Sequence, residues 1–230
     1  DGVEITKDMD YFPLLNKKVG KQVLVTVYNP DTKKRWDEIV KPISKGTQNE
    51  LLYQRWIKHN AEVVDSLSNG TLGYVHIKSM GDASYRDVYA DILGKYNKRK
   101  GIVIDTRFNG GGRLHEDIEI LFSGEKYLEQ VIRDSVACVM PSRRYVKPSI
   151  MLMCEANYSN AHGTPWVYKH KKIGKLVGMP VPGTMSSVTW ETLQDTDLYF
   201  GLPVVGYRTQ EGYYLENFQL EPDIKVRNTP

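Results

Sequence analysis

Two short apolar runs constrain the fold of this chain most strongly. They lie in "GIVIDTRF" (101–108) and "SIMLMCE" (149–155), and each is followed by a polar or glycine-rich turn and then by a helical pattern. An uninterrupted apolar run of this length is typical of a strand covered on both faces, as in a parallel sheet whose strands are joined by helices. The sequence therefore predicts an α/β fold built from βαβ units.

The same alternation of strand and helix extends over residues 71–230. Runs of apolar residues predict further strands, and apolar residues at helical spacing predict the helices between them. The predicted strands are 71–77 and 174–180, and the predicted helices are 84–98, 114–122 and 160–172. We expect residues 71–230 to form one core.

Residues 1–45 show a different pattern. Two β-rich segments, 21–28 and 35–43, flank the turn-forming sequence "NPDTKK". A block of this length is too short to bury a hydrophobic core of its own. We therefore expect it either to lean on the rest of the chain or to be the end of a larger domain.

The hydrophobic period becomes helical after Thr47. "TQNE" (47–50) fits the capping box T-x-x-E, in which Thr47 caps a helix and Glu50 reaches back to it. Apolar residues at helical spacing continue to Leu67, and "SNG" (68–70) is typical of a helix end. The prediction is a helical linker over residues 46–70.

Charge and composition exclude several classes of function. The chain carries 31 Lys and Arg against 28 Asp and Glu, a net charge of +3, without the clustered basic stripe typical of nucleic-acid binding. No apolar segment approaches 18 residues, so we expect no membrane span. "HED" (115–117) lacks the second histidine of the zinc motif H-E-x-x-H, and we expect neither a metal nor a cofactor.

A run of three glycines follows the first apolar strand in "DTRFNGGGR" (105–113). Glycines between a buried strand and a helix let the backbone approach a ligand with its N–H groups pointing outward. Neither the dinucleotide fingerprint nor the P-loop motif is present. Phosphate binding, stabilisation of an oxyanion and a tight structural turn remain three alternatives for this segment.

Ser159 stands where the second apolar strand turns into a helix, in "CEANYSNAHG". It is either a nucleophile near the positive end of a helix dipole or a helix N-cap. His162 lies three residues further on, on the same helical face. Glu216 lies among aromatic and apolar residues in "YYLENF", as a functional carboxylate or as an exposed one on a strand.

Five segments together resemble the C-terminal region of the tricorn-type peptidases and, more distantly, the tail-specific (C-terminal processing) serine peptidases. They are "SNGTLGYVHIKSMGD", "IVIDTRFNGGG", "CEANYSNAHG", "IGKLVGMPVPGT" and "LENFQLEPDIKV". The resemblance implies a crotonase/ClpP-like core, preceded at residues 1–45 by the C-terminal part of a PDZ-like domain. It also implies a serine peptidase that cleaves peptides or unfolded protein and that can form homo-oligomers.

The resemblance assigns roles to individual residues. Ser159 takes the nucleophile position, and Gly112 and Asn160 take the positions whose backbone N–H groups form the oxyanion hole. Glu216 takes the position of the acid that orients the general base. Substrate binding is implied for two further residues, Gly111 and Glu129, with Glu129 favouring basic side chains.

The sequence departs from the family pattern at the general base. The serine–histidine pair expected before the strand at 71–77 reads Ser68–Asn69, and an asparagine amide cannot serve as a general base. His162 is the first alternative base and His76 the second. The Ser/Lys dyad of the tail-specific branch is absent, because Thr184 occupies the lysine position.

Three functions therefore stay open at this point. The first is an active serine peptidase with Ser159 as nucleophile. The second is a catalytically impaired module that keeps the peptide-binding cleft without the base. The third is an acyl-transfer enzyme of crotonase architecture, in which two N–H groups stabilise a thioester enolate.

Overall fold

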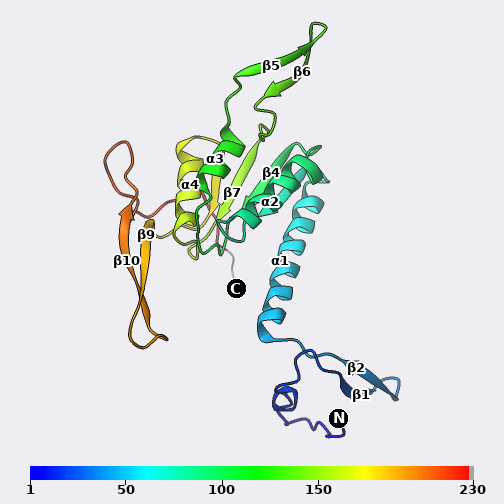
Figure 1. Ribbon diagram of the computed structural model, residues 1–230. Coiled ribbons are helices and arrows are strands. Elements are labelled where there is room, and N and C mark those ends of the chain that lie inside the picture. The colour runs from blue at the N-terminus through cyan, green and yellow to red at the C-terminus, as the bar shows by residue number, and fades with distance from the viewer. Residues whose placement is uncertain (228–230) are drawn as a thin grey trace. The chain divides into compact units, whose positions relative to one another are not determined.

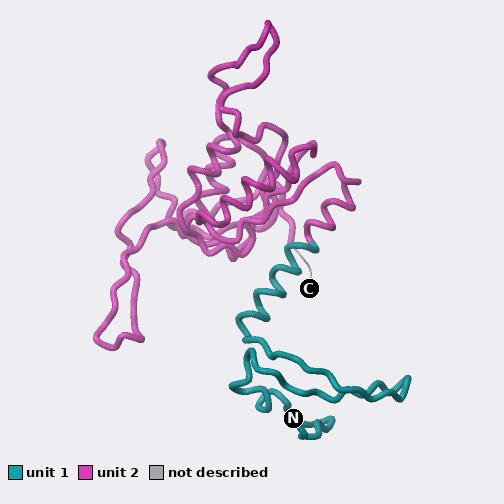
Figure 2. The backbone as a smooth tube through the Cα atoms, turned by 45° about the vertical axis from the view of Figure 1, so that its right-hand side comes forward, with its two compact units in different colours: residues 1–59 teal, residues 60–230 magenta. Residues whose placement is uncertain are grey.

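The computed structural model describes residues 1–227 and divides into two units, residues 1–59 and 60–230 (Figure 2). The first unit contains a 3-10 helix, η1 (Phe12–Leu15), and an antiparallel hairpin of β1 (Val23–Asn29) and β2 (Lys34–Val40). The side-chain oxygen of Asn29 accepts the backbone N–H groups of Asp31 and Thr32, which closes the predicted turn. Within residues 1–59, all described, Val23 is the single buried residue.

Helix α1 (Lys45–Leu67) lies where the sequence predicts a helix, but it begins two residues before Thr47. Ser44 caps it, because the Ser44 Oγ accepts the N–H of Thr47 at 3.0 Å and the Ser44 carbonyl accepts that of Gln48 at 2.9 Å. The predicted cap at Thr47 is therefore wrong. Both residue types are good caps, and the pattern could not choose between two that lie three positions apart.

The second unit is built on a five-stranded parallel sheet, counted over the described residues, with the strand order β11–β8–β7–β4–β3 (Figure 1). This confirms the α/β class and the parallel sheet. Every residue of β4, an interior strand between β7 and β3, is buried, which explains its apolar start. The strands are β3 (Leu72–His76), β4 (Gly101–Asp105), β7 (Ser149–Met153), β8 (Lys175–Gly178) and β11 (Ile224–Lys225).

Three helical segments connect these strands. Helix α2 (Asp82–Ala90) continues into a π-helical turn, η2 (Asp91–Lys95), and joins β3 to β4. Helices α3 (His115–Ser123) and α4 (Asn160–His170) lie side by side (Figure 1). The core comprises apolar side chains of strands and helices, among them Ile104, Met151, Leu176, Ile92, Ile118 and Tyr168.

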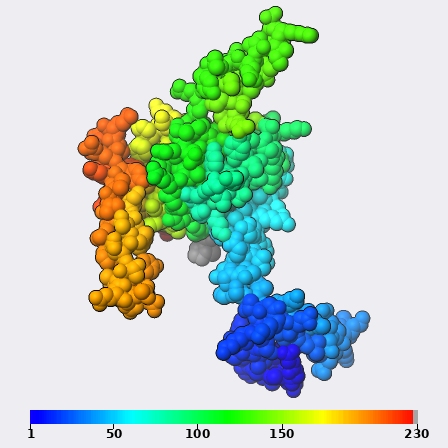
Figure 3. Space-filling view, viewed as in Figure 1, coloured from blue at the N-terminus to red at the C-terminus, as the bar shows by residue number. Residues whose placement is uncertain are grey.

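Two antiparallel hairpins were not predicted from the sequence. The first joins β5 (Leu128–Ile132) to β6 (Ser135–Met140), and the second joins β9 (Ser186–Thr192) to β10 (Tyr199–Gly206). Most of their side chains are open to solvent, as Figure 3 shows for the green and orange segments. Within residues 1–227, none of the helices is both long and apolar enough to cross a membrane.

Candidate active site

The glycine loop (residues 109–113) and the Ser159 turn (residues 154–160) follow the carboxyl ends of two adjacent strands, β4 and β7. Adjacent parallel strands end at the same edge of a sheet, so the topology alone brings the two segments together. Asn109 joins them at atomic level. Its buried side chain donates to the Ile77 carbonyl at 2.7 Å and accepts the Gly111 N–H at 2.8 Å, and its carbonyl accepts the Tyr158 N–H at 3.0 Å.

Asn157 makes a second link between the two segments. Its side-chain N–H group donates to the Thr106 Oγ1 at 2.9 Å and to the Ala161 carbonyl at 3.2 Å. Thr106 is itself fixed to β7, because its N–H donates to the Leu152 carbonyl at 3.0 Å. Both loops are therefore held by buried amide side chains, those of Asn109 and Asn157.

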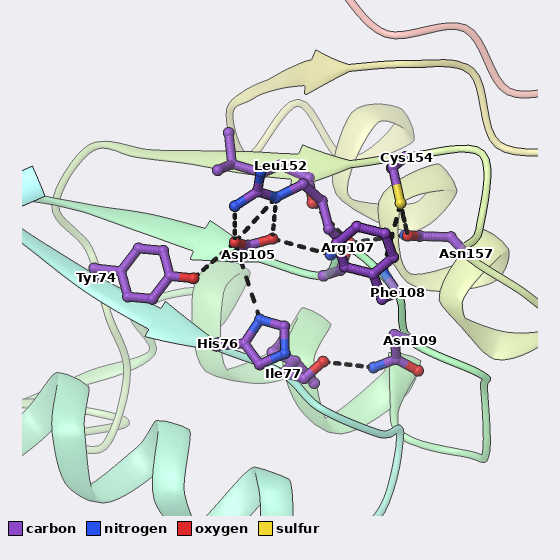
Figure 4. Close-up of polar contacts among 11 residues, drawn as sticks. Tyr74, His76, Ile77, Asp105, Arg107, Phe108, Asn109, Leu152, Cys154 and Asn157 are labelled. Carbon is purple, nitrogen blue, oxygen red and sulfur yellow. Dashed lines mark hydrogen bonds and ion pairs between the residues drawn. The ribbon is translucent and has the colours of Figure 1, made fainter. Parts of the chain in front are cut away.

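A buried polar cluster lies around Asp105, at the end of β4 (Figure 4). Tyr74 donates its hydroxyl to Asp105 at 2.7 Å, and the Arg107 guanidinium pairs with the same carboxylate at 2.6 Å. Burial, and then the charge of Asp105, raise the pKa of Tyr74. His76 lies in this cluster with its Nδ1 4.0 Å from Asp105, and burial lowers its pKa. The structure thus places the second alternative base inside the Asp105 cluster.

Gly111 and Gly112 pass so close to their neighbours that no other residue fits. A β-carbon on Gly111 would lie 2.7 Å from the Ser159 Cβ, and one on Gly112 would lie 2.2 Å from the Met80 carbonyl oxygen. Both have positive φ, +97° and +137°. Met80 bonds to both sides of Gly112, by donating to the Gly111 carbonyl and accepting from the Arg113 N–H. Among the described residues, the Gly112 N–H itself has no acceptor.

Ser159 adopts a strained backbone conformation, with φ 54° and ψ −123°. A non-glycine residue in this region costs on the order of 1–3 kcal/mol, and such strain concentrates at functional sites. Ser159 occupies the N-cap position of α4, but its side chain makes no capping hydrogen bond. Its backbone N–H donates to the Thr184 Oγ1 at 3.3 Å, and the residue is half-buried. The turn presents a serine hydroxyl between a strand and a helix, as in a nucleophile elbow.

Asn160 is buried, and its side chain has a structural role that the sequence did not reveal. Its Oδ1 accepts the N–H groups of Leu114 and His115 at 2.9 and 3.2 Å, and its amide nitrogen lies 2.7 Å from the His115 Nδ1. The residue after Ser159 therefore holds the start of α3, which follows the glycine loop. An asparagine after a serine gives no sequence signal for such a contact.

Glu216 is half-buried and accepts the Ser186 hydroxyl at 2.8 Å. The next residue, Asn217, donates its N–H to the Gly183 carbonyl at 2.8 Å. Thr184, next to Gly183, accepts the N–H of Ser159. Residues 183–186 therefore connect the Glu216 segment (residues 216–217) to the Ser159 turn. The exposed-strand alternative for Glu216 is wrong, because this residue lies in a half-buried loop.

His162 is completely buried beneath the Ser159 turn. Neither ring nitrogen has a hydrogen-bond partner within residues 1–227, so His162 does not bond to the Ser159 hydroxyl. Burial lowers the pKa of His162 to about 4, although the nearby charge of Glu216 acts in the opposite direction. His162 is bonded to Ser159 only through the backbone, by its N–H to the Ser159 carbonyl at 2.8 Å, and its imidazole is a weak base that does not bond to the serine hydroxyl.

The structure does not bring Ser68 and Asn69 to Ser159. Both precede β3, whereas Ser159 follows the carboxyl end of β7, and the two strands run parallel in one sheet. Residues 68–69 and Ser159 therefore lie at opposite edges of the sheet. The length of a five-residue strand, about 16 Å, separates these two edges. Asn69 is exposed, and the Ser68 Oγ accepts the Leu72 N–H at 3.0 Å.

Glu129 lies in β5, in the first unpredicted hairpin, and its carboxylate pairs with Lys126. It is exposed. Among the described residues, no group of three or more His, Cys, Asp or Glu side chains is placed to hold a metal ion. The groups that the structure does bring together are the glycine loop, the Ser159 turn and the Glu216 segment.

Comparison with known proteins finds relatives for the whole chain. It is 24% identical to the tricorn protease of Thermoplasma volcanium and 25% identical to a tricorn protease homolog of Saccharolobus solfataricus, over 100% and 96% of its length. These matches cover 22% and 20% of the relatives, so the chain spans about a fifth of their length.

Solved structures show a related fold. The crystal structure of the tricorn protease superposes with a TM-score of 0.76 and 21% identity, over 93% of this chain and 21% of that one. A putative peptidase from Parabacteroides merdae superposes with a TM-score of 0.54 and 18% identity, over 70% of this chain and 56% of that one. Residues 71–226 match the model of peptidase family S41, and since this match covers more than half of the sequence, the chain belongs to peptidase family S41.

Proposed function

We propose that this chain is a serine peptidase domain in which the Ser159 hydroxyl gives up its proton to a base and attacks the carbonyl carbon of a peptide bond. The C–N bond breaks, the amine leaves with that proton, and water then hydrolyses the ester of the acyl-enzyme. The observation that carries the proposal is the strained Ser159 turn directly against Gly111. The hydroxyl of Ser159 has no hydrogen-bond partner within residues 1–227, and the residue is half-buried, so a substrate can reach it.

The backbone N–H groups of Gly112 and Asn160 are proposed to form the oxyanion hole. The Gly112 N–H has no acceptor among the described residues, and Asn160 is the first residue of α4, where N–H groups lack intrahelical partners. The positive end of the α4 dipole adds to their effect on a developing negative charge. One such donor contributes about a hundredfold to a thousandfold to the rate of acyl transfer.

Glu216 is proposed to orient the imidazole that accepts the Ser159 proton. One of its carboxylate oxygens is bonded to Ser186, which fixes the side chain, and a carboxylate has further acceptor sites for an imidazole N–H. Asn69 lies at the other edge of the sheet, and His162 would have to leave its buried position to serve. The proton acceptor is thus the one part of the mechanism that lacks a residue in this arrangement.

A second function, peptide binding without hydrolysis, is favoured by that same observation. Within residues 1–227 the hydroxyl of Ser159 has no imidazole as a hydrogen-bond partner. A site with an oxyanion hole and a serine but no base would bind a peptide carbonyl and leave it intact. The match to a peptidase family supports a peptide as the ligand over a thioester.

Several wider assignments belong to the same proposal. Residues 1–45 would be the end of a PDZ-like domain, residues 46–70 a linker, and residues 71–230 a crotonase/ClpP-like core. Gly111 would line the substrate cleft and Glu129 would favour basic side chains. Homo-oligomers are proposed by analogy with the family.

A mixture of peptides tests both functions at once. The wild-type chain and Ser159→Ala are incubated with the mixture, cleavage is followed by mass spectrometry, and retention is measured after rapid filtration. Cleavage by the wild type alone supports the peptidase. Retention by both without cleavage supports the binding module, and neither cleavage nor retention contradicts both functions.

A further inference from the structure

The amide of Asn160 has only one orientation that satisfies its neighbours. Its Oδ1 accepts two backbone N–H groups, from Leu114 and His115. Turning the amide over would place N–H against N–H at both contacts. Asn160 is only 2% exposed, so these buried groups would lose their hydrogen bonds. The amide nitrogen therefore faces the His115 Nδ1, 2.7 Å away.

This orientation fixes the position of the proton on His115. An amide nitrogen only donates, so the His115 Nδ1 must accept. In a neutral imidazole one nitrogen accepts and the other carries the proton, so the proton of His115 is on Nε2. A proton on Nδ1 would oppose the Asn160 N–H and break the contact.

The contact joins the two halves of the proposed oxyanion hole. His115 is the first residue of α3, three residues after Gly112, and Asn160 directly follows Ser159. The His115 ring also meets the Tyr207 ring edge-on at 6.2 Å, and the Tyr207 hydroxyl bonds to Ser187 at 2.9 Å. Ser187 adjoins Ser186, the partner of Glu216. His115 therefore lies between the Ser159 turn and the segment that fixes Glu216.

We infer that His115 is a positioning residue: as the Nε2–H tautomer it accepts the Asn160 amide and holds the Ser159–Asn160 turn against the glycine loop. The inference rests on the proposed function, because the rate that it controls is the attack by Ser159. His115 touches no reacting atom. Its effect passes through Asn160, whose backbone N–H is one of the two proposed oxyanion donors.

Two substitutions separate the acceptor from the ring. His115→Asn keeps an acceptor, since the asparagine oxygen occupies the place of Nδ1, but loses most of the ring. His115→Phe keeps a ring beside Tyr207 but leaves the Asn160 amide without an acceptor. His170→Phe is the control, because His170 stacks on Trp166 at the other end of α4, with ring centroids 4.6 Å apart.

Three readouts test the inference on the intact chain. The ¹⁵N shifts of the His115 ring should show the proton on Nε2. Amide hydrogen exchange at 159–163 should become faster in His115→Phe. The rate of Ser159 labelling by a fluorophosphonate should fall about tenfold to a hundredfold, because a small displacement of a reacting group lowers its rate by that order. His115→Asn should keep most of the rate, and His170→Phe should match the wild type.

The outcomes separate this inference from the proposed function. A proton on Nδ1, or equal exchange and labelling rates in His115→Phe and the wild type, would overturn the role of His115 even if the chain cleaves peptides. Absence of labelling in the wild type would overturn the proposed function instead. In that case the ring shifts and the exchange at 159–163 still decide whether His115 holds the turn.

Discussion

Gly111 lies directly against Ser159, so that a β-carbon on the glycine would be 2.7 Å from the serine Cβ. The relationship joins residues 48 positions apart (159 − 111), each following one of two adjacent parallel strands. It explains why a glycine run and a serine turn that are each ambiguous alone become one candidate site. The close approach also makes the site sensitive to a single methyl group.

Gly111→Ala is predicted to displace the Ser159 turn and to reduce fluorophosphonate labelling of Ser159 by at least about a hundredfold. The methyl group would overlap the serine and the Tyr158 carbonyl, and the positive φ disfavours alanine, at a combined cost of about 2–3 kcal/mol. Urea unfolding measures this cost as a lower free energy of unfolding. Gly110→Ala is the matched control, because a β-carbon there meets nothing within 4 Å. Equal effects of the two substitutions would contradict the geometry.

Asn109→Ala is predicted to lower the free energy of unfolding by about 2–3 kcal/mol, because it leaves the Ile77 carbonyl and the Gly111 N–H without their buried partner. Since Asn109 orders the glycine loop, amide exchange at 110–113 should also become faster. Urea unfolding and hydrogen exchange measure the two effects. Asn97→Ala, at an exposed position, should change neither. A loop that exchanges at the wild-type rate in Asn109→Ala would show that the Asn109 side chain does not order the loop.

His162 is predicted to make the chain sensitive to acid. Burial lowers the pKa of His162 to about 4, below its usual value of about 6.5, so the unfolded chain binds the proton more readily. This contribution to stability is complete above pH 6.5 and is lost as the pH falls towards 4. From pH 7 to pH 5 the loss is about 2 kcal/mol.

Urea unfolding of the wild type and of His162→Leu at both pH values tests this effect. Leucine has a similar volume and no titrating group. On acidification the variant should therefore lose less stability than the wild type, by the amount that His162 contributes. His76, whose pKa burial also lowers, stays in both proteins and contributes equally. Parallel losses in the two proteins would mean that His162 is not held neutral by burial.

Asn69→His is predicted to create no peptidase activity. Residue 69 precedes β3, at the sheet edge opposite to Ser159, so an imidazole there cannot take the serine proton. Hydrolysis of a chromogenic peptide by this variant and by the wild type is the measurement. A gain of hydrolysis that Ser159→Ala abolishes would restore the sequence-based assignment of the base to position 69.

The sequence predicted the elements that follow from strong apolar patterns. All five residues of β4 and three of the five residues of β7 are buried, and the continuous apolar residues of both strands identify them in the sequence. The β5–β6 hairpin was missed because its two-residue turn is Arg133–Asp134, both with positive φ, where Asn-Gly is the usual signal.

The candidate site was predicted in its parts but not in its connections. Ser159, Gly112 and Glu216 could be named because the resemblance orders them along the chain. The hydrogen bonds of Asn109 and Asn160 join residues 32 and 46 positions apart, and no local pattern reports such pairs. The separation of Asn69 from Ser159 follows once the strands are known to be parallel, because residue 69 precedes β3 and residue 159 follows β7.

The most direct test of the central claim is labelling with a fluorophosphonate, followed by mass spectrometry of the digested chain. The account predicts that the wild type is labelled at Ser159, that Ser159→Ala is not labelled, and that Ser135→Ala, in the exposed β6, is labelled like the wild type. Labelling at another serine, or none at Ser159 over the pH range in which the chain stays folded, would contradict the assignment of Ser159 as the nucleophile.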